Sequence, residues 1–350
     1  MIAQKIVSWQ RQHGRHDLPW QRVLEPYPVW LSEIMLQQTQ VVTVIPYFQR
    51  FMEQWPTVVD LASAPLEEVL SAWSGLGYYS RARYLHRCAQ VVTQQYGGHF
   101  PTTATELVQL PGIGPSTAAS IASLCFCERV TLFDGNVQRV LSRLWAFDLD
   151  LAQTVNQKIL HKQAQILAHD LPRAQDMPAL TQGLMDLGAT VCRPRQPACH
   201  ECPLHQDCAA HAQNRVHDLP KKSKTLQRKT FMWWLCMAFR EDGALWLDRR
   251  PERGIWSGLQ APRIAESIEQ AQLWRAQFSA QQEEWPLAWT HVLTHRDLVL
   301  HPCVLTGAQT PADQASGQWV LPKDWEQAAL PAPVRRWLLE FTVAHTGGPF

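Results

Sequence analysis

Residues 110–124 read LPGIGPSTAASIASL, a glycine-containing turn that runs directly into a segment with helical character. Gly112 and Gly114 permit a tight turn in which the backbone approaches another group closely. The N–H groups at the start of the following helix can hold a phosphate. No strand pattern precedes the turn, which argues against a dinucleotide-binding motif. The stretch therefore indicates a helix–hairpin–helix that holds a DNA phosphate, although any turn between two helices can use glycine.

The chain around this turn changes character near residue 230. Residues 1–212 show apolar positions at helical spacing in several segments, namely 31–45, 66–73, 80–95 and 116–125. Residues 213–230 are polar and basic and predict a linker. Beyond it, short apolar runs and turn signals predict a hairpin at 231–249, strands at 298–305 and 317–321, and helices at 268–278 and 334–343. We expect a mostly α N-terminal region followed by an α+β domain.

Length and composition narrow the class of protein. The chain has 350 residues, of which 46% are apolar and 18% charged, so two domains with packed cores are expected. Its net charge of +1 neither demands nor excludes a nucleic-acid partner. There is no apolar run long enough to span a membrane, and the first residues lack the apolar core of a signal peptide. We therefore expect a cytoplasmic protein, in which structural disulfides are rare.

Four of the nine cysteines lie close together. They follow the spacing C-x6-C-x2-C-x5-C and are Cys192, Cys199, Cys202 and Cys208. Four thiolates in so short a loop fit either a tetrahedral zinc ion or a [4Fe–4S] cluster. Zinc ribbons usually have two C-x2-C pairs, whereas this loop has one. The unequal spacing favours the iron–sulfur cluster.

Two acidic residues lie in unusual contexts. Glu33 is flanked by the apolar residues 34–36, which imply a buried helix, and burial would raise its pKa and suit it to donate a proton. The amides of Gln37 and Gln38 beside it could contact base edges or fill a gap in a duplex. Asp134 precedes a helix, so it is either an ordinary N-cap or an acid directed into a cleft.

The segment GLGYYSRAR at 75–83 combines an apolar and an aromatic side chain with two arginines. Leu76 and Tyr78 could enter a base stack as a wedge. The alternative is a turn at the start of a helix with a tyrosine in the core.

Together these motifs resemble a known family. Their order along the chain is LPW (18–20), WLSEIMLQQTQV (30–41), GLGYYSRAR (75–83), LPGIG (110–114), FDGNVQRV (133–140) and the four-cysteine loop. This order resembles the adenine DNA glycosylases, the MutY family, through almost all of residues 5–210. Endonuclease III-like enzymes share the glycine turn, the aspartate and the cysteine loop. The resemblance implies a helical barrel at about 21–130, an iron–sulfur subdomain at about 1–20 and 131–212, and a monomer associated with the nucleoid of a bacterial-type cell.

The resemblance also implies roles for individual residues. Glu33 would protonate adenine, Asp134 would stabilise the sugar cation, and the four cysteines would hold a [4Fe–4S] cluster. Residues expected to contact DNA or the base are Gln38, Leu76, Tyr78, Gly112, Gly114, Ser116, Asn136, Gln182, Arg15 and Trp20. The substrate would be duplex DNA with adenine opposite 8-oxoguanine or guanine.

Two departures bear on lyase chemistry. Ser116 stands where endonuclease III-like enzymes carry a nucleophilic lysine, and no lysine lies between Lys5 and Lys158. A monofunctional glycosylase without strong lyase activity at abasic sites is therefore expected. Gln138 stands where several relatives carry a lysine, which should weaken Schiff-base trapping at that position.

Residues 231–350 resemble the Nudix-like C-terminal domain of the same family, with the clearest match in RRPERGIWSGLQAP at 249–262. The metal-binding Nudix box is absent, so pyrophosphate hydrolysis is not expected. The family recognises 8-oxoguanine with a Phe-Ser-His segment, and the matching residues here are Leu293, Thr294 and His295. The Thr294 hydroxyl could accept a hydrogen bond from N7–H of 8-oxoguanine, a donor that guanine lacks.

Two rival functions remain at this point. A glycosylase for oxidised pyrimidines would share the fold and the cluster, but Ser116 and the C-terminal domain argue against it. An iron–sulfur protein that senses DNA without catalysis would not need Glu33 and Asp134.

Overall fold

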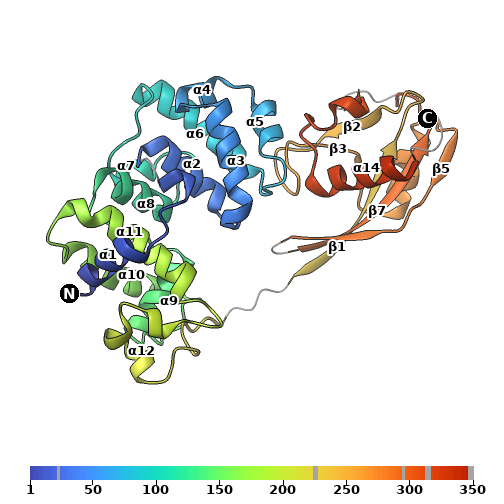
Figure 1. Ribbon diagram of the computed structural model, residues 1–350. Coiled ribbons are helices and arrows are strands. Elements are labelled where there is room, and N and C mark those ends of the chain that lie inside the picture. Colours follow the sequence, from blue (N-terminus) through green and yellow to red (C-terminus); the bar gives the residue numbers. More distant parts are fainter. Residues whose placement is uncertain (22–23, 224–227, 294–295, 312–316, 346–350) are drawn as a thin grey trace. The chain divides into compact units, whose positions relative to one another are not determined.

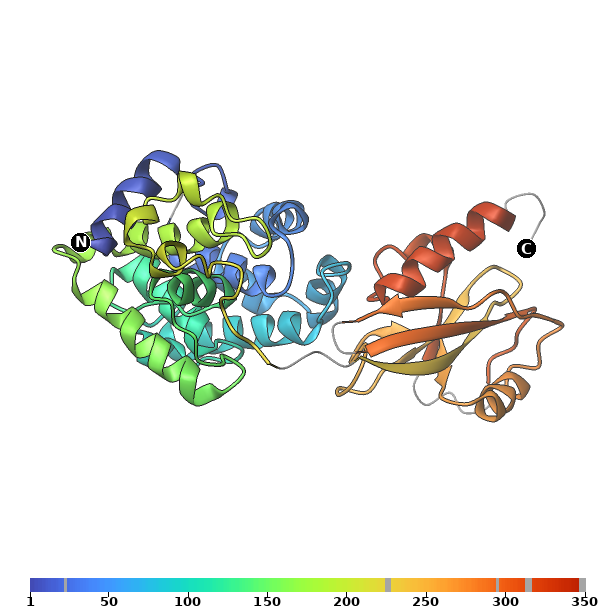
Figure 2. The ribbon, with the colours of Figure 1, turned by 90° about the horizontal axis from the view of Figure 1, so that it is seen from below.

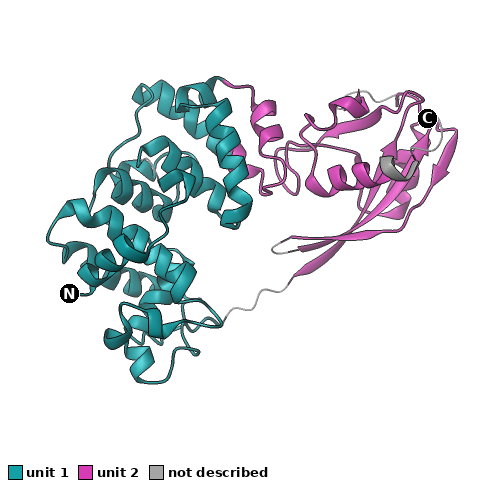
Figure 3. Cartoon of the chain, in the orientation of Figure 1, with its two compact units in different colours: residues 1–63, 84–224 teal, residues 64–83, 225–350 magenta. Residues whose placement is uncertain are grey.

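The computed structural model describes residues 1–21, 24–223, 228–293, 296–311 and 317–345. The chain divides into two compact units (Figure 3). The first comprises Met1–Ser63 and Tyr84–Lys224, and the second comprises Ala64–Arg83 and Thr225–Phe350. None of the helices in the described residues is both long and apolar enough to cross a membrane. The subdivision of the helical region predicted from the sequence stays a prediction.

The first unit is helical, as the sequence predicted (Figure 1). Its helices are α1 (Ile2–His13), η1 (Pro19–Gln21), α2 (Pro26–Leu36), α3 (Val41–Gln54), α4 (Val58–Ser63), most of α6 (Ser80–Tyr96), α7 (Ala104–Leu107), α8 (Pro115–Phe126), α9 (Gly135–Leu144), α10 (Thr154–His169), η2 (Ala174–Asp176), α11 (Met177–Asp186), η3 (Leu187–Val191), η4 (Cys199–Glu201), η5 (His205–Asp207) and α12 (Ala209–Ala212).

The expectation of one helix over 31–45 is wrong. Helix α2 ends at Leu36, and α3 begins at Val41. Between them Gln38 adopts a left-handed backbone conformation with φ of 58°, which interrupts helical hydrogen bonding. Gln37 and Gln40 therefore do not continue the helical face that carries Glu33.

The core of the first unit shows how helix α9 forms. Val137, Val140, Leu141 and Leu144 recur at the spacing of one helical face, and all four are buried. They pack in one cluster with side chains of α1, α10 and α11. Burying such a side chain contributes about 1.5–3 kcal/mol, so this face fixes the helix against its neighbours.

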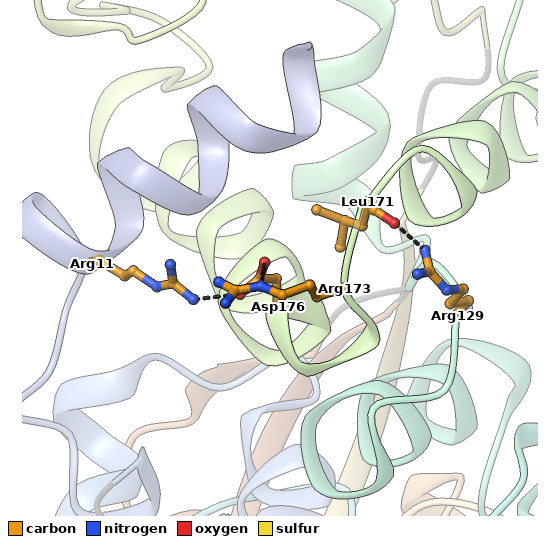
Figure 4. Close-up of polar contacts among 5 residues, drawn as sticks. All are labelled: Arg11, Arg129, Leu171, Arg173 and Asp176. Carbon is orange, nitrogen blue, oxygen red and sulfur yellow. Dashed lines mark hydrogen bonds and ion pairs between the residues drawn. The ribbon is translucent and has the colours of Figure 1, made fainter.

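Polar contacts join the N-terminal helix to the chain between α10 and α11 (Figure 4). Arg11 on α1 donates to Asp176 Oδ1 at 2.5 Å, and Arg173 donates to both oxygens of the same carboxylate at 3.3 Å. Arg129 donates to the carbonyl oxygen of Leu171 at 2.6 Å. Asp176 thus joins segments that are far apart in the sequence.

The helix–hairpin–helix predicted from LPGIG is formed by α7, a glycine turn and α8. Gly112 has φ of +77°, and a Cβ atom there would lie 2.6 Å from Cβ of Tyr84. Gly112 is therefore required by both its conformation and its packing. A Cβ atom at Gly114 would meet nothing within 4 Å, which leaves space beside the first N–H groups of α8.

The described residues of the second unit form two sheets together with helices, as expected of an α+β domain (Figure 2). Strands β1 (Lys229–Ala238) and β7 (Arg296–Thr306) run parallel at the centre of the larger sheet. Strands β4 (Arg263–Ala265) and β5 (Gln282–Glu284) lie on either side of this pair. Strand β6 (Trp289–Val292) also pairs with β7. The smaller sheet has the order β3-β2-β8. The elements of this unit are α5 (Leu66–Ala72), β1 (Lys229–Ala238), β2 (Leu245–Arg249), β3 (Gln260–Ala261), β4 (Arg263–Ala265), α13 (Ile268–Ala276), β5 (Gln282–Glu284), β6 (Trp289–Val292), β7 (Arg296–Thr306), β8 (Gly317–Val320), η7 (Pro322–Asp324) and α14 (Ala332–His345).

The hairpin predicted at 231–249 is wrong. A turn does join β1 to β2, and a single bridge between Phe239 and Leu245 closes it. The two strands then separate, because β1 pairs with β4 and β7 whereas β2 pairs with β3 and β8. The helices predicted at 268–278 and 334–343 are confirmed by α13 and α14.

The second unit also contains residues 64–83, far from the rest of it in sequence. The Tyr79 hydroxyl donates to the carbonyl oxygen of Leu330 at 3.2 Å. The Arg83 guanidinium donates to the backbone and side-chain oxygens of Ser257. These contacts fix the turn that carries Leu76 and Tyr78 to the strand-containing unit.

Candidate active site

Glu33 lies on α2 in the apolar setting that the sequence indicated. Burial raises the pKa of its carboxyl group from 4.5 to about 7. The nearby Ser120 hydroxyl acts in the opposite direction and lowers this pKa, although no hydrogen bond of ordinary geometry joins the two groups. The negative charge of Asp134 raises the pKa further. The carboxyl group is therefore in part protonated near neutral pH, as a proton donor requires.

Asp134 is an N-cap, the first of the two roles that the sequence left open. Its Oδ1 atom accepts a hydrogen bond of 2.7 Å from the backbone N–H of Val137, so it caps α9. Its charge also acts on Glu33, which shows that the two acids lie near each other despite their separation in sequence. Asn136 donates to the second oxygen, Oδ2, at 3.3 Å. These hydrogen bonds hold Asp134 in one orientation.

A pocket lies in front of Glu33. Helices α2, α8 and α11 contribute to its walls, together with the segment around η1. The sequence-predicted residues Arg15, Trp20 and Gln182 all line it. The complete lining is Arg15, Leu18, Trp20, Gln21, Leu24, Val29, Ser32, Glu33, Leu36, Val41, Leu124, Gln182 and Met185. An apolar pocket with a few polar groups is typical of a site for a small molecule.

Asp186 organises one wall of this pocket. The Arg15 side chain donates to its Oδ1 at 2.7 Å, and the Arg15 backbone N–H donates to Oδ2 at 3.0 Å. Gln182, one helical turn earlier on α11, donates to Oδ1 at 2.8 Å. The Asp186 side chain is fully buried, so these hydrogen bonds balance its charge. Sequence reasoning missed this residue, although its spacing from Gln182 was visible.

The residues expected to contact DNA have different exposures. Gln38 is exposed in the turn after α2, and Ser116 is partly exposed in the first turn of α8. In the second unit Tyr78 has 41% of its surface exposed, whereas Leu76 has 5%. Of the two wedge candidates, Tyr78 is the one that a partner can reach, and the prediction for Leu76 is not supported by its buried position.

Thr294 and His295, the expected contacts to 8-oxoguanine, lie outside the described residues. Leu293 directly before them donates its N–H to the carbonyl oxygen of Arg296, the first residue of β7, at 2.8 Å. Gln138 lies partly buried in the first turns of α9.

The four cysteines of the loop are all partly buried. Among the described residues, no three histidine, cysteine or acidic side chains are gathered closely enough to hold a metal ion. The thiols nevertheless lie within electrostatic range of one another. Burial raises the pKa of Cys202 to about 11, with smaller contributions from Cys192, Cys208 and Cys199. Arg143 donates to the Cys192 sulfur at 3.3 Å. The donor set and its cationic neighbour fit an anionic thiolate cluster.

The fold and the pair of acids define a helix–hairpin–helix DNA glycosylase. The profile of the HhH-GPD superfamily of base excision DNA repair proteins matches residues 31–165, and the NUDIX domain profile matches residues 234–340. A solved structure of a thermostable thymine-DNA glycosylase matches with a TM-score of 0.52 and 26% identity, covering 61% of this chain and 95% of that one.

Curated relatives make the assignment more specific. An adenine DNA glycosylase of Buchnera aphidicola from Acyrthosiphon pisum is 32% identical over 97% of both chains. The human adenine DNA glycosylase is 48% identical over 59% of this chain and 38% of its own length. The chain belongs to the adenine DNA glycosylase family and is a DNA N-glycosylase.

Proposed function

We propose that this chain removes adenine paired with 8-oxoguanine, or less efficiently with guanine, from duplex DNA and leaves the strand intact. One observation carries the proposal. Glu33, with its pKa raised to about 7, faces a pocket of mainly apolar residues and lies within electrostatic range of Asp134. One protonated and one ionised carboxyl group are the pair that glycosidic bond cleavage requires.

The target adenine must leave the base stack before it can enter the pocket. Adenine is a poor leaving group as an anion, so Glu33 delivers a proton to N7. The bond between C1′ and N9 then breaks. Its electron pair stays with the protonated base, which leaves as neutral adenine, and the sugar becomes cationic. The Asp134 carboxylate stabilises this cation, and Glu33 takes a proton from the water that attacks C1′.

The sequence around these acids supports a monofunctional enzyme. Strand cleavage by a lyase needs a nucleophilic amine that forms a Schiff base with the opened sugar. The sequence has no lysine between Lys5 and Lys158, and Ser116 occupies the corresponding place at the start of α8. Hydrolysis should therefore stop at the abasic site.

DNA binding uses separate groups on the chain. The N–H groups at the start of α8, beside the open space at Gly114, hold a phosphate. In the first unit, the exposed side chain of Gln38 is suited to fill the gap that the extruded base leaves. In the second unit, the exposed side chain of Tyr78 is suited to stack on a base. Thr294 accepts the N7–H of 8-oxoguanine, and its hydroxyl is the group on which discrimination from guanine depends. The chain acts as a monomer in the cytoplasm.

The four-cysteine loop holds a [4Fe–4S] cluster through Cys192, Cys199, Cys202 and Cys208. When it is bound, the cluster supplies a rigid cross-link for the loop rather than a reactant. Arg143 stabilises the loop by donating to the carbonyl oxygens of Arg193 and Pro194. The basic side chains of Arg193 and Arg195 are exposed and suited to contact the phosphate backbone.

A single-turnover assay tests the proposal. The full-length chain is incubated with a duplex that contains one A·8-oxoguanine pair, and half of each sample is heated in alkali before the strands are resolved. We expect cleavage of the adenine strand only after alkali. Cleavage without alkali would contradict the monofunctional mechanism, and no cleavage by a protein with an intact cluster would contradict adenine excision.

A further inference from the structure

Gln21 lies at the end of η1, directly after the pocket residue Trp20. Its backbone N–H donates to the carbonyl oxygen of Leu18 at 3.0 Å, which fixes the turn. The side-chain atoms Oε1 and Nε2 are both buried, and neither has a hydrogen-bond partner within the described residues. Leaving both ends of a buried amide unpaired is unfavourable, so a native protein seldom does so without a reason.

The same side chain lines the pocket in front of Glu33. Three other polar residues of the pocket already have partners inside the protein. Arg15 and Gln182 donate to Asp186, and the Ser32 hydroxyl donates to the carbonyl oxygen of Val29 at 2.8 Å. The amide of Gln21 thus retains both an acceptor and a donor for whatever enters the pocket.

Adenine matches these two free atoms. Its edge carries the 6-amino group, a donor, next to N1, an acceptor, and a primary amide presents an acceptor next to a donor. We propose that Gln21 determines specificity by reading this edge of the extruded adenine, with Oε1 accepting from the 6-amino group and Nε2 donating to N1. This inference rests on the proposed function. It adds a second point of recognition to the contact between Glu33 and N7.

The contacts of Gln21 and Glu33 exclude different bases from the pocket. A pyrimidine such as cytosine also presents an amino group beside a ring acceptor, so Gln21 alone would accept it. Only a purine offers N7 to Glu33. A purine without the 6-amino group would reach Glu33 but would leave Oε1 of Gln21 buried and unpaired, and a site built to bond a polar group rejects an analogue that lacks it.

The test combines a change in the protein with a change in the base. Gln21→Met keeps a similar volume and removes both polar atoms. Single-turnover excision is measured opposite 8-oxoguanine for adenine and for purine, which has hydrogen in place of the 6-amino group. We expect Gln21→Met to slow adenine excision on the order of 10- to 100-fold and purine excision by much less, so that the preference for adenine falls about tenfold.

Gln157→Met is the matched control, because the Gln157 amide donates to the carbonyl oxygen of Leu151 outside the pocket. It should leave the ratio of adenine to purine excision unchanged. The melting temperature of Gln21→Met should not fall, since the substitution removes buried unpaired atoms. Equal slowing of both bases, or slowing of neither, would overturn the role of Gln21 alone. No adenine excision by the unchanged chain would overturn the proposed function and this inference with it.

Discussion

Asp248 in one unit and Glu33 in the other are both enclosed carboxyl groups, but their charged neighbours have opposite signs. In the strand-containing unit Asp248 accepts from the buried Arg263 guanidinium at 2.8 Å, and that guanidinium also lies over the Trp274 ring. In the helical unit Glu33 has an acidic neighbour, Asp134, and its pKa rises to about 7. A neighbouring cation favours the charged form of a carboxyl group, whereas burial beside another acid favours the protonated form and suits the group to catalysis.

The largest expected effect tests the catalytic side of this comparison. Glu33→Gln keeps the size and polarity of the side chain but cannot donate a proton. Adenine excision should fall on the order of 1000-fold or more, while the affinity for duplex DNA stays nearly unchanged. Single-turnover rates and a binding titration measure the two quantities. Glu25→Gln, an exposed substitution before the same helix, should change neither, and rapid excision by Glu33→Gln would refute the assigned role.

The pH dependence of excision should follow the protonation of Glu33. The protonated form is the active one, so the rate should be constant below its pKa of about 7 and fall about tenfold per pH unit above it. Measurement of single-turnover rates between pH 6 and 9 checks this. A rate that rises steadily over that range would show that an ionised Glu33 is the active form.

Breaking the pair in the strand-containing unit should affect stability and leave the chemistry unchanged. Arg263→Met leaves Asp248 largely enclosed without its cation. The free energy of unfolding of this unit should therefore fall by about 2–4 kcal/mol. Arg240→Met, which breaks an exposed pair with Asp242, should cost much less stability, because solvent screens an exposed pair. Denaturant unfolding of both variants measures the difference. Equal losses of unfolding free energy in the two variants would mean that burial of the pair between Arg263 and Asp248 does not affect stability.

Glu33 should itself reduce stability at neutral pH. Its pKa is raised in the fold, so the folded state binds the proton more tightly, and stability falls as pH rises from 4.5 through about 7. Glu33→Gln removes this loss of stability, because the glutamine side chain carries no charge at any of these pH values. The variant should be more stable than the unchanged chain by on the order of 1–3 kcal/mol at pH 8, with little difference below pH 4.5.

Unfolding curves of the two proteins at both pH values test this, with Glu25→Gln again as the control. A stabilisation that is equal at the two pH values would have another origin than the carboxyl charge.

The sequence predicted those features that depend on local pattern. The apolar neighbours of Glu33 indicated its partial burial, the glycines of LPGIG indicated the hairpin, and an N-cap was one of the two roles considered for Asp134. Each of these follows from a few adjacent residues, because caps, turns and helical faces are set by short spacings.

Features that depend on distant neighbours could not be predicted in this way. Nothing in the pattern of residues 37–40 marks Gln38 as left-handed, since glutamine seldom adopts that conformation. The apolar runs on either side of the turn at 240–244 have the pattern of a hairpin, but strand β1 pairs with β4 and β7 instead. The unpaired amide of Gln21 is visible only once the walls of the pocket are assembled.

The most direct test of the account is a titration of the Glu33 carboxyl group itself. The full-length chain is labelled with ¹³C at the glutamate side chains, and the carboxyl resonance that disappears in Glu33→Gln is followed with pH. The account predicts a midpoint near 7 for this resonance. A midpoint near 4.5, the ordinary value for glutamate, would contradict the claim that burial and Asp134 prepare Glu33 to donate a proton.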